Sequence, residues 1–393
     1  MTSPLANTYA RLPVGFTHGK GVWLFDAEGN VYLDGLSGIG VSCLGHAHPA
    51  LVKAISEQAA KVIHTSNLYE VPLQTQLAQR ILDITGLDEV LFSNSGAEAN
   101  ESAIKIARLY GHKRGNDLPT IITMESSWAG RTLGTLAATG SEKARMGFGP
   151  LPEGFLQVKY NDLDALKAAA AKEPRVVAIL LEVLQGEGGI RPTDAQYLKD
   201  LRALCDQNEW LLMIDEVQSG IGRTGKWLAH QWTDVKPDVI TLAKGLAGGV
   251  PIGAMVAGGR AKGVFTLGTH GTTFGGGPLV CAAGLAVFDA IEKENLLENA
   301  HIVGDYLKAQ LIEKLGHLAG VKDIRGRGLM LGIELDRPCG MLAQQALAAG
   351  LLINVTRDTV IRLLPPLILS KDEADQLINR LVPLITQFLA PSS

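Results

Sequence analysis

The sequence predicts an α/β protein with a large domain, built on a doubly wound and mostly parallel sheet, and a smaller α+β domain. Three observations support this prediction. Several short runs are apolar at every position rather than at alternate positions, as in strands buried on both faces. Helical stretches separate these runs, which is the alternation of a parallel α/β sheet. Beyond about Pro278 long helical stretches dominate and the strands are short.

The chain opens with a predicted β-hairpin, in which a turn at Glu28-Gly29-Asn30 joins two strand-like halves. We assign residues 1–50, with this hairpin, to the small domain. Residues 51–280 form the predicted large domain, and residues 281–393 complete the small one.

Six predicted strands make up the large sheet, with helices expected over residues 97–114 and near 195–207. The strands lie in the runs EVLFS from Glu89, TIITME from Thr120, VVAILLEV from Val176, WLLMIDEV from Trp210, DVITLAK from Asp238 and IGAMVAG from Ile252. In the C-terminal region we expect one long helical stretch over residues 279–315, short strands in GLMLGIEL and TVIRLLPPL, and a last helix from about Lys371.

Composition excludes several classes of function. The 393 residues are 46% hydrophobic and 19% charged, with a net charge of −4 and no long run of one sign, so we expect no nucleic-acid partner. The most apolar stretch, VVAILLEVL, is too short for a membrane span and contains Glu182. No signal peptide is evident, and four scattered cysteines match no zinc or redox pattern. A cytoplasmic protein without a membrane partner is the simplest expectation.

Three short segments carry chemistry-bearing residues at the ends of predicted strands. In SNSGAEAN, Ser95 and Glu98 have the spacing of a capping box, and the start of the helix offers free backbone N–H groups to an anion. A well-capped helix without a ligand has the same pattern. In LLMIDEV, Asp215 and Glu216 end an apolar run, at the edge where open α/β sheets bind ligands. A surface acidic pair is the alternative.

Lys244 ends the apolar run DVITLAK and is followed by several glycines. A strand-end lysine that points to solvent is the ordinary interpretation. Glycines, however, let a bulky ligand approach the backbone, and a partly desolvated lysine has a lowered pKa and attacks carbonyl groups. An anion seat, a carboxylate and a lysine at one sheet edge are what pyridoxal 5′-phosphate (PLP) needs.

Two other motifs suggest different ligands. GIGRTG, residues 220–225, matches the G-x-G-x-x-G dinucleotide fingerprint, and Asp238 lies near the spacing of a ribose contact, which leaves an NAD-dependent oxidoreductase as an alternative. The glycines do not follow the strand directly, which weakens the match. In GHAHP, His46 and His48 have a spacing that could suggest a metal, but no third ligand cluster is evident and we expect no metal.

The blocks SNSGAEAN, LEVLQGEGG, IDEVQSGIGRTG, LAKGLAGGVPIGAM and GTTFGGGP together resemble the class III aminotransferases of fold type I, over nearly the whole chain. The resemblance is closest to the acetylornithine aminotransferases. It implies a PLP-dependent transaminase that moves the terminal amine of N2-acetyl-L-ornithine to 2-oxoglutarate in arginine biosynthesis. A broader range of ω-amine donors, including ornithine and succinylornithine, is the alternative within the family.

The resemblance also implies the cofactor-binding residues. Lys244 would form the Schiff base with PLP and then move the proton, and Asp215 would pair with the pyridine nitrogen. The phosphate would lie at Ser95, Gly96 and Ala97, and the ring would contact Trp128, Val217 and Gln218. Thr273 would bind the phosphate of the other subunit's cofactor, which implies a homodimer with shared active sites.

For the substrate, the resemblance implies that Arg131 and Arg362 hold carboxylates, and that Glu187 covers Arg362 when an ω-amino donor binds. A guanidinium suits a carboxylate because it binds both oxygens. Thr272 is a further expected substrate contact. Ile39 stands where ornithine aminotransferases have tyrosine, which favours an acetylated donor.

The chain departs from the family pattern at three places: at Trp128-Ala129, at Ala97, where the family usually has threonine, and at Gly277, where it usually has asparagine. The family usually has Phe-His-Gly-Arg where this chain has Trp128-Ala129-Gly130-Arg131. An indole still stacks on a cofactor ring, but Ala129 leaves space where the family has an imidazole. We therefore expect the chemistry to remain and the donor preference to be open. A binding protein that has lost turnover is a third hypothesis, against which intact Lys244 and Asp215 argue.

Overall fold

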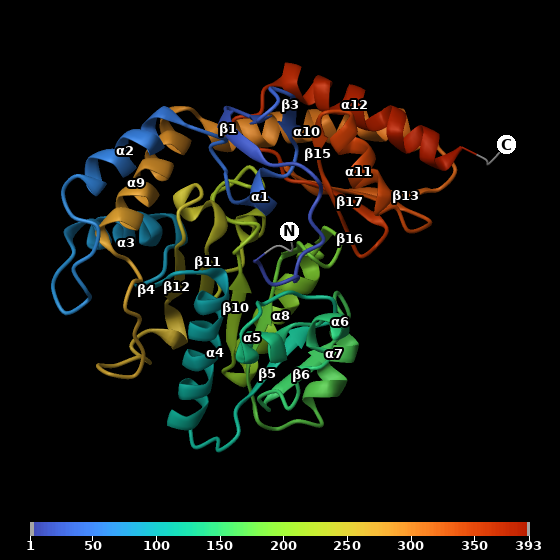
Figure 1. Ribbon diagram of the computed structural model, residues 1–393. Helices are drawn as coiled ribbons and strands as arrows, with labels where there is room; N and C mark the ends of the chain where they lie inside the picture. The colour runs from blue at the N-terminus through green and yellow to red at the C-terminus, as the bar shows by residue number, and fades with distance from the viewer. Residues whose placement is uncertain (1–3, 391–393) are drawn as a thin grey trace.

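The computed structural model describes residues 4–390, and its centre is a seven-stranded sheet (Figure 1). The strand order is β4-β12-β11-β10-β7-β5-β6, and only β12 runs antiparallel to its neighbours. This confirms the predicted mostly parallel α/β sheet. The strands are β4 (Glu89–Ser93), β5 (Thr120–Met124), β6 (Phe155–Val158), β7 (Val176–Leu181), β10 (Leu211–Asp215), β11 (Val239–Leu242) and β12 (Gly253–Ala257).

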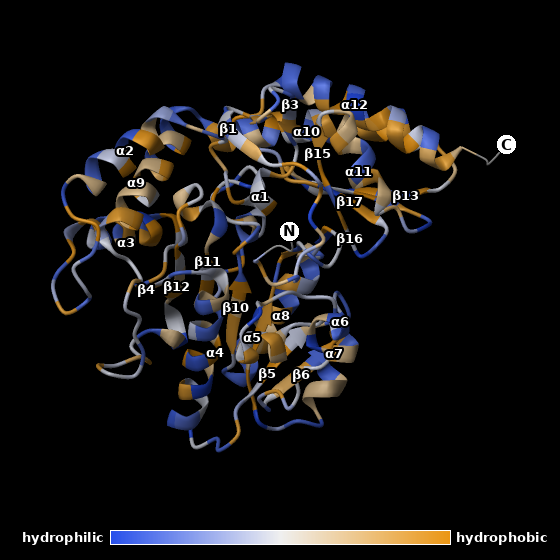
Figure 2. Ribbon diagram, viewed as in Figure 1, coloured by the Kyte–Doolittle hydropathy of each residue, from blue (hydrophilic) through white to orange (hydrophobic). Residues whose placement is uncertain are grey.

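Helices cover both faces of this sheet, which explains the continuous apolar runs. In β10, Leu211 and Met213 join a core cluster with α4, whereas Leu212 and Ile214 join another with α8. Both faces therefore need apolar residues. In Figure 2 β10 is accordingly hydrophobic over most of its length. The covering helices are α4 (Gly96–Lys113), α5 (Leu133–Ala138), α6 (Glu142–Arg145), α7 (Leu163–Ala170) and α8 (Ala195–Asn208).

The C-terminal region has its own antiparallel sheet, in the order β13-β14-β17-β16. The predicted single helical stretch over residues 279–315 is wrong in one respect: it is two helices, because Asn295 adopts a left-handed φ of 53° between them. The elements are α9 (Pro278–Lys293), α10 (Leu296–Leu315), β13 (Val321–Arg327), β14 (Met330–Leu335), α11 (Met341–Ala348), β16 (Asn354–Thr356), β17 (Val360–Leu363) and α12 (Lys371–Leu389).

The predicted N-terminal hairpin is present and joins the C-terminal part of the chain. β2 and β3 pair around the turn, β1 adds outside β2, and β15 pairs in parallel with β3. The ends of the chain therefore share one sheet, whereas the domain limits at residues 50 and 280 stay a prediction. The elements are β1 (Phe16–Lys20), β2 (Trp23–Asp26), β3 (Val31–Asp34), α1 (Ser37–Gly40) and β15 (Leu351–Leu352).

Two helices that the sequence did not predict, α2 (Pro49–Ala59) and α3 (Pro72–Thr85), lie against α9 at one side of the molecule (Figure 1). Short elements complete the chain: β8 (Leu184–Gln185), β9 (Arg191–Pro192) and the 3-10 turns η1 (Ala229–Trp232), η2 (Lys244–Ala247) and η3 (Gly259–Ala261). None of the helices within residues 4–390 is long and apolar enough to cross a membrane.

Candidate active site

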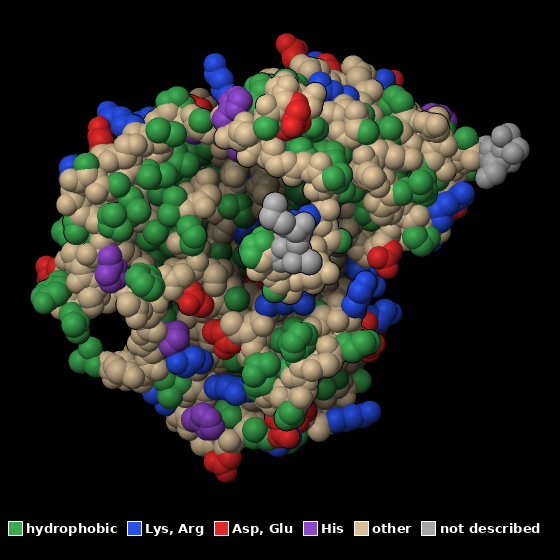
Figure 3. All heavy atoms as spheres, viewed as in Figure 1, with side chains coloured by type: hydrophobic (Ala, Val, Ile, Leu, Met, Phe, Trp, Pro, Cys, Tyr) green, Lys and Arg blue, Asp and Glu red, His purple; other side chains and the backbone are tan. Residues whose placement is uncertain are grey.

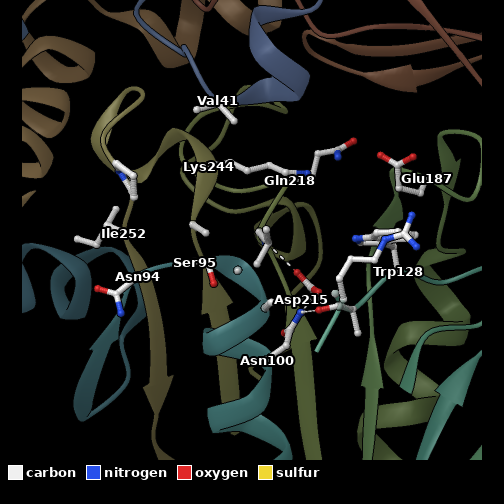
Figure 4. A pocket seen from close by; sticks show the side chains of 18 of the residues that line it. Val41, Asn94, Ser95, Asn100, Trp128, Glu187, Asp215, Gln218, Lys244 and Ile252 are labelled. Carbon is white, nitrogen blue, oxygen red and sulfur yellow. Dashed lines mark hydrogen bonds between the residues drawn. The ribbon is translucent and has the colours of Figure 1, made fainter. Parts of the chain in front are cut away.

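A cavity of about 410 Å³ opens at the carboxyl edge of the sheet. It brings together ten of the residues that the sequence pointed to: Ser95, Gly96, Ala97, Trp128, Arg131, Glu187, Asp215, Val217, Gln218 and Lys244. In Figure 4 Lys244 and Gln218 lie above Asp215 and Asn100, and Trp128 and Glu187 face Ile252 and Asn94 across the site. Residues more than a hundred positions apart thus meet, because each follows the end of a strand.

Lys244 stands just beyond the end of β11 and opens η2 with a left-handed φ of 43°. The side chain is half-buried and has no hydrogen-bond partner among residues 4–390. Burial of its ammonium group lowers the pKa of Lys244 to about 8, and the positive charge of Arg362 is the second cause of this decrease. A lysine in this state is a far better nucleophile near neutral pH than an exposed one.

Asp215 ends β10 and is 6% exposed. Its Oδ1 accepts a hydrogen bond from the Val217 N–H at 2.8 Å, and its Oδ2 accepts one from Asn100 Nδ2 at 2.7 Å. Burial raises the pKa of Asp215, and these two hydrogen bonds oppose the rise. Glu216 points elsewhere and anchors the loop around His230, so only one of the acidic pair enters the cavity.

The start of α4 forms the expected anion seat. Ser95 is the N-cap and its Oγ accepts from the Glu98 N–H at 3.2 Å, whereas the Glu98 carboxylate accepts from the Asn94 N–H at 2.6 Å. Neither interaction uses the N–H groups of Gly96 and Ala97, which have no other acceptor within the described chain. Gly96 is required here, because a Cβ would lie 2.6 Å from Val217 Cγ1.

The two arginines of the site differ in their surroundings. Arg362 is fully buried: its Nη1 donates to Glu187 Oε1 at 2.6 Å and to Gln218 Oε1 at 3.3 Å, and Nη2 has no partner in the described structure. Arg131 is exposed and lies over the Trp128 ring, 4.6 Å from its centroid. An unpaired N–H inside a buried guanidinium is a direct sign of a missing acceptor.

Four predicted site residues lie outside the cavity lining of this chain. Arg362 lies just behind it, through its contacts with Glu187 and Gln218. Thr272 Oγ1 accepts from Asn94 Nδ2 at 3.1 Å, which places it at the rim. Thr273 is exposed beside it, and Ile39 is 38% exposed with a φ of 68°.

Three polar residues of the cavity, Asn94, Asn100 and Glu182, were not predicted from the sequence. Glu182 is 7% exposed, and its carboxylate accepts from the Trp128 N–H and the Gly186 N–H, both at 3.0 Å. Burial, followed by the charge of Asp215, raises its pKa. A charge inside the most apolar run of the chain was the available signal. Asn100 has only a weak signal, a polar residue on the buried face of a helix.

The dinucleotide fingerprint does not form a ligand loop. Gly222 and Gly225 are packed against Leu367 and His301, and the next element is only the short turn η1 instead of a long helix. Asp238 is paired with Arg202 at 2.8 Å. His46 and His48 bind different carboxylates, Asp34 and Glu294.

An open helix start, a buried carboxylate and a half-buried amine in one cavity fit PLP, so the fold and the cavity define an enzyme that uses this cofactor. The family model for class-III aminotransferases matches residues 5–385. The chain is 70% identical over 390 residues, 99% of each chain, to acetylornithine aminotransferase 1 of Bordetella bronchiseptica.

Solved structures agree with this match. A crystal structure of the ornithine aminotransferase from Toxoplasma gondii, with PLP at partial occupancy in its active site, has a TM-score of 0.93 at 33% identity, covering 98% of this chain and 92% of that one. N-acetylornithine aminotransferase from Stenotrophomonas maltophilia has a TM-score of 0.84 at 34% identity, covering 97% and 98%. The chain belongs to the class-III aminotransferase family and is a PLP-dependent transaminase.

Proposed function

We propose that this transaminase moves the terminal amine of N2-acetyl-L-ornithine to 2-oxoglutarate, giving N-acetyl-L-glutamate 5-semialdehyde and glutamate, a step of arginine biosynthesis. The observation that carries the proposal is the pair of unlike guanidiniums. Arg131 is open, whereas Arg362 is buried and covered by Glu187. The full-length relative named acetylornithine aminotransferase 1 supports the same donor.

The guanidiniums suit two substrates of different charge. Arg131 would hold the carboxylate that N-acetylornithine and 2-oxoglutarate both carry. Glu187 would stay on Arg362 while the donor is bound, because the reacting end of the donor carries no carboxylate for Arg362. It would move aside when the second carboxylate of 2-oxoglutarate arrives, because that carboxylate satisfies Arg362 including its unpaired Nη2.

The cofactor would be held by residues at three strand ends. Gly96 and Ala97 would bind the phosphate through their N–H groups, and Asp215 would hold a proton on the ring nitrogen. Bound PLP supplies an aldehyde for amines and a protonated ring that draws electrons from the reacting carbon. Lys244, as the neutral amine, would move the proton between the substrate carbon and the cofactor carbon.

A homodimer in a reduced, cytoplasmic compartment would complete this proposal. Thr273 of each subunit would reach the cofactor phosphate of the other. Large apolar side chains near Thr273 are exposed, and in Figure 3 hydrophobic side chains gather over α2, α3 and α9. Both features would suit a contact with a second subunit. All four cysteines are buried and unpaired, which suits a reducing compartment.

A donor comparison tests the proposal. Purified enzyme with PLP and 2-oxoglutarate is given N-acetylornithine, ornithine, succinylornithine or another ω-amino acid, and glutamate is measured. We expect kcat/KM for N-acetylornithine to exceed that for ornithine by at least about tenfold, with no product from Lys244→Ala. Equal values would support the broad-range alternative, suggested by the space at Ala129. No glutamate from any donor would overturn the proposal.

A further inference from the structure

Arg131 has an aromatic partner where an anionic one would be usual. Its guanidinium carbon lies 4.6 Å from the centroid of the Trp128 ring, and no carboxylate within residues 4–390 pairs with it. Both side chains line the cavity. Arg362 differs in this respect, because its Nε donates to Asn354 and its Nη1 donates to Glu187.

The backbone that presents this pair is fixed at several points. The Trp128 N–H donates to Glu182, and the Ala129 N–H donates to Thr139 Oγ1 at 3.0 Å. Asn100 Nδ2 donates to the Ala129 carbonyl at 2.8 Å. Gly130 has a φ of 144°, and the space for a side chain there is filled by Thr135. The relative position of the two side chains therefore depends on their own contact and not on a mobile loop.

An indole ring holds a guanidinium without occupying the N–H groups of the guanidinium. The attraction acts through the face of the ring, whereas a carboxylate partner would occupy the donor fork and cancel the charge. Arg131 consequently keeps its donors for a ligand while it gives up much of its rotational freedom. An arginine restrained in this way binds a carboxylate more tightly than a freely moving one.

We propose that Trp128 is a specificity residue of this enzyme: its ring holds Arg131 in the orientation that receives the substrate carboxylate. Trp128 thereby favours carboxylate-bearing donors and acceptors over simple amines. The inference rests on the proposed function in taking substrate carboxylates as the ligands of Arg131. It extends that proposal by giving the unusual tryptophan a role in substrate selection beside any contact with the cofactor.

Binding of glutarate tests this role without turnover. Glutarate is a dicarboxylate with neither amine nor keto group, and its Kd is measured by calorimetry on the PLP-loaded enzyme. We expect Trp128→Leu to weaken glutarate about three- to tenfold, and Trp128→Phe, which keeps a weaker ring, to give a smaller loss. If the leucine variant does not load PLP, as judged by absorption, the phenylalanine variant carries the test.

A double-mutant cycle separates this coupling from a merely structural role. Arg131→Lys keeps a positive charge for glutarate but lacks the planar group that lies on the indole. In this background we expect the effect of Trp128→Leu to shrink to less than about twofold. Trp227→Phe is the matched control, because Trp227 stacks on Phe288 in the core at 4.8 Å and its loss should leave glutarate binding unchanged.

Two results would overturn the inference. One is unchanged glutarate affinity in both Trp128 variants. The other is a loss of glutarate affinity on Trp128→Leu that is equally large in the parent enzyme and in the Arg131→Lys enzyme. Neither result changes the outcome of the donor comparison. A failure of N-acetylornithine as donor would likewise not change the measured glutarate affinities, so the two proposals are tested independently.

Discussion

Lys244 owes its reactivity to its place at the end of a buried strand. Its pKa of about 8 makes roughly a tenth of the side chain neutral at pH 7, against less than a thousandth for an ordinary lysine. We therefore expect the rate at which the cofactor-free enzyme takes up PLP to rise with pH through a midpoint near 8 and then level off. Stopped-flow absorption measures this rate. A rate that keeps rising to about pH 10 would mean an unshifted lysine.

Asn100 is a positioning residue for Asp215. Its amide is oriented by Thr241 Oγ1, which donates to Asn100 Oδ1 at 2.8 Å, and Nδ2 then faces the Asp215 carboxylate. We expect Asn100→Ala to raise the pKa of Asp215 further and to weaken PLP binding about tenfold, because a hydrogen bond to a buried charge is lost. Equilibrium dialysis of PLP and the pH profile of kcat measure the effect.

The exposed Asn208, which donates to the Leu204 carbonyl at 2.9 Å, provides the control for this test. We expect Asn208→Ala to bind PLP like the parent enzyme. Equal PLP affinity and an unmoved pH profile in the Asn100 variant would contradict the positioning role.

At the residue scale, the sequence predicted the groups with distinctive chemistry and missed the groups that support them. Lys244 and Asp215 were found because a charge directly after an apolar run is unusual. Asn100 and Glu182 were missed because their importance depends on partners distant in sequence, such as Thr241 and Trp128, which become neighbours only in the folded chain.

At the scale of elements, the phosphate seat depends on close contact between β12 and the start of α4. A Cβ at Gly253 would lie 2.2 Å from the Ser95 carbonyl oxygen. We expect Gly253→Ala to lower the free energy of unfolding by about 1–3 kcal/mol and to weaken PLP, because the strand must shift away from the seat. Urea denaturation of the cofactor-free protein measures the first effect. Gly15→Ala, with no atom within 4 Å of its new Cβ, should change neither quantity.

Six strands of the large sheet and two of its covering helices, α4 and α8, could be predicted because a continuous apolar run has few other solutions, whereas β6, α5, α6 and α7 were not predicted. Elements with weaker patterns could not. α2 and α3 both begin with proline and are exposed on one side, so neither shows a continuous apolar run. The break at Asn295 between α9 and α10 depends on one left-handed residue, which the periodicity of the surrounding helices hides.

At the scale of the whole molecule, two loops with exposed apolar side chains lie side by side. Leu68 is 86% exposed and Phe274 is 65% exposed, and Asn67 joins the loops by donating to the Thr272 carbonyl at 3.1 Å. Exposed apolar surface of this kind marks interfaces. We expect the protein to sediment as a dimer, and Leu68→Asp with Phe274→Asp to give a monomer that binds PLP weakly.

Ile302 on α10 is 58% exposed and lies outside both loops, so Ile302→Asp should remain a dimer. A double variant that sediments like the parent protein would place the interface elsewhere and would leave Thr273 without a role in the neighbouring site.

We propose that this chain carries an amine from N-acetylornithine to 2-oxoglutarate through PLP held at Lys244. The most direct measurement is the visible absorption of the PLP-loaded enzyme, recorded before and after addition of N-acetylornithine and then of 2-oxoglutarate. We expect a yellow band that bleaches with the donor and returns with the acceptor, and that is absent in Lys244→Ala. A band that N-acetylornithine leaves unchanged, while another ω-amine bleaches it, would contradict the proposed donor. A protein that stays colourless with PLP would contradict the role of Lys244 itself.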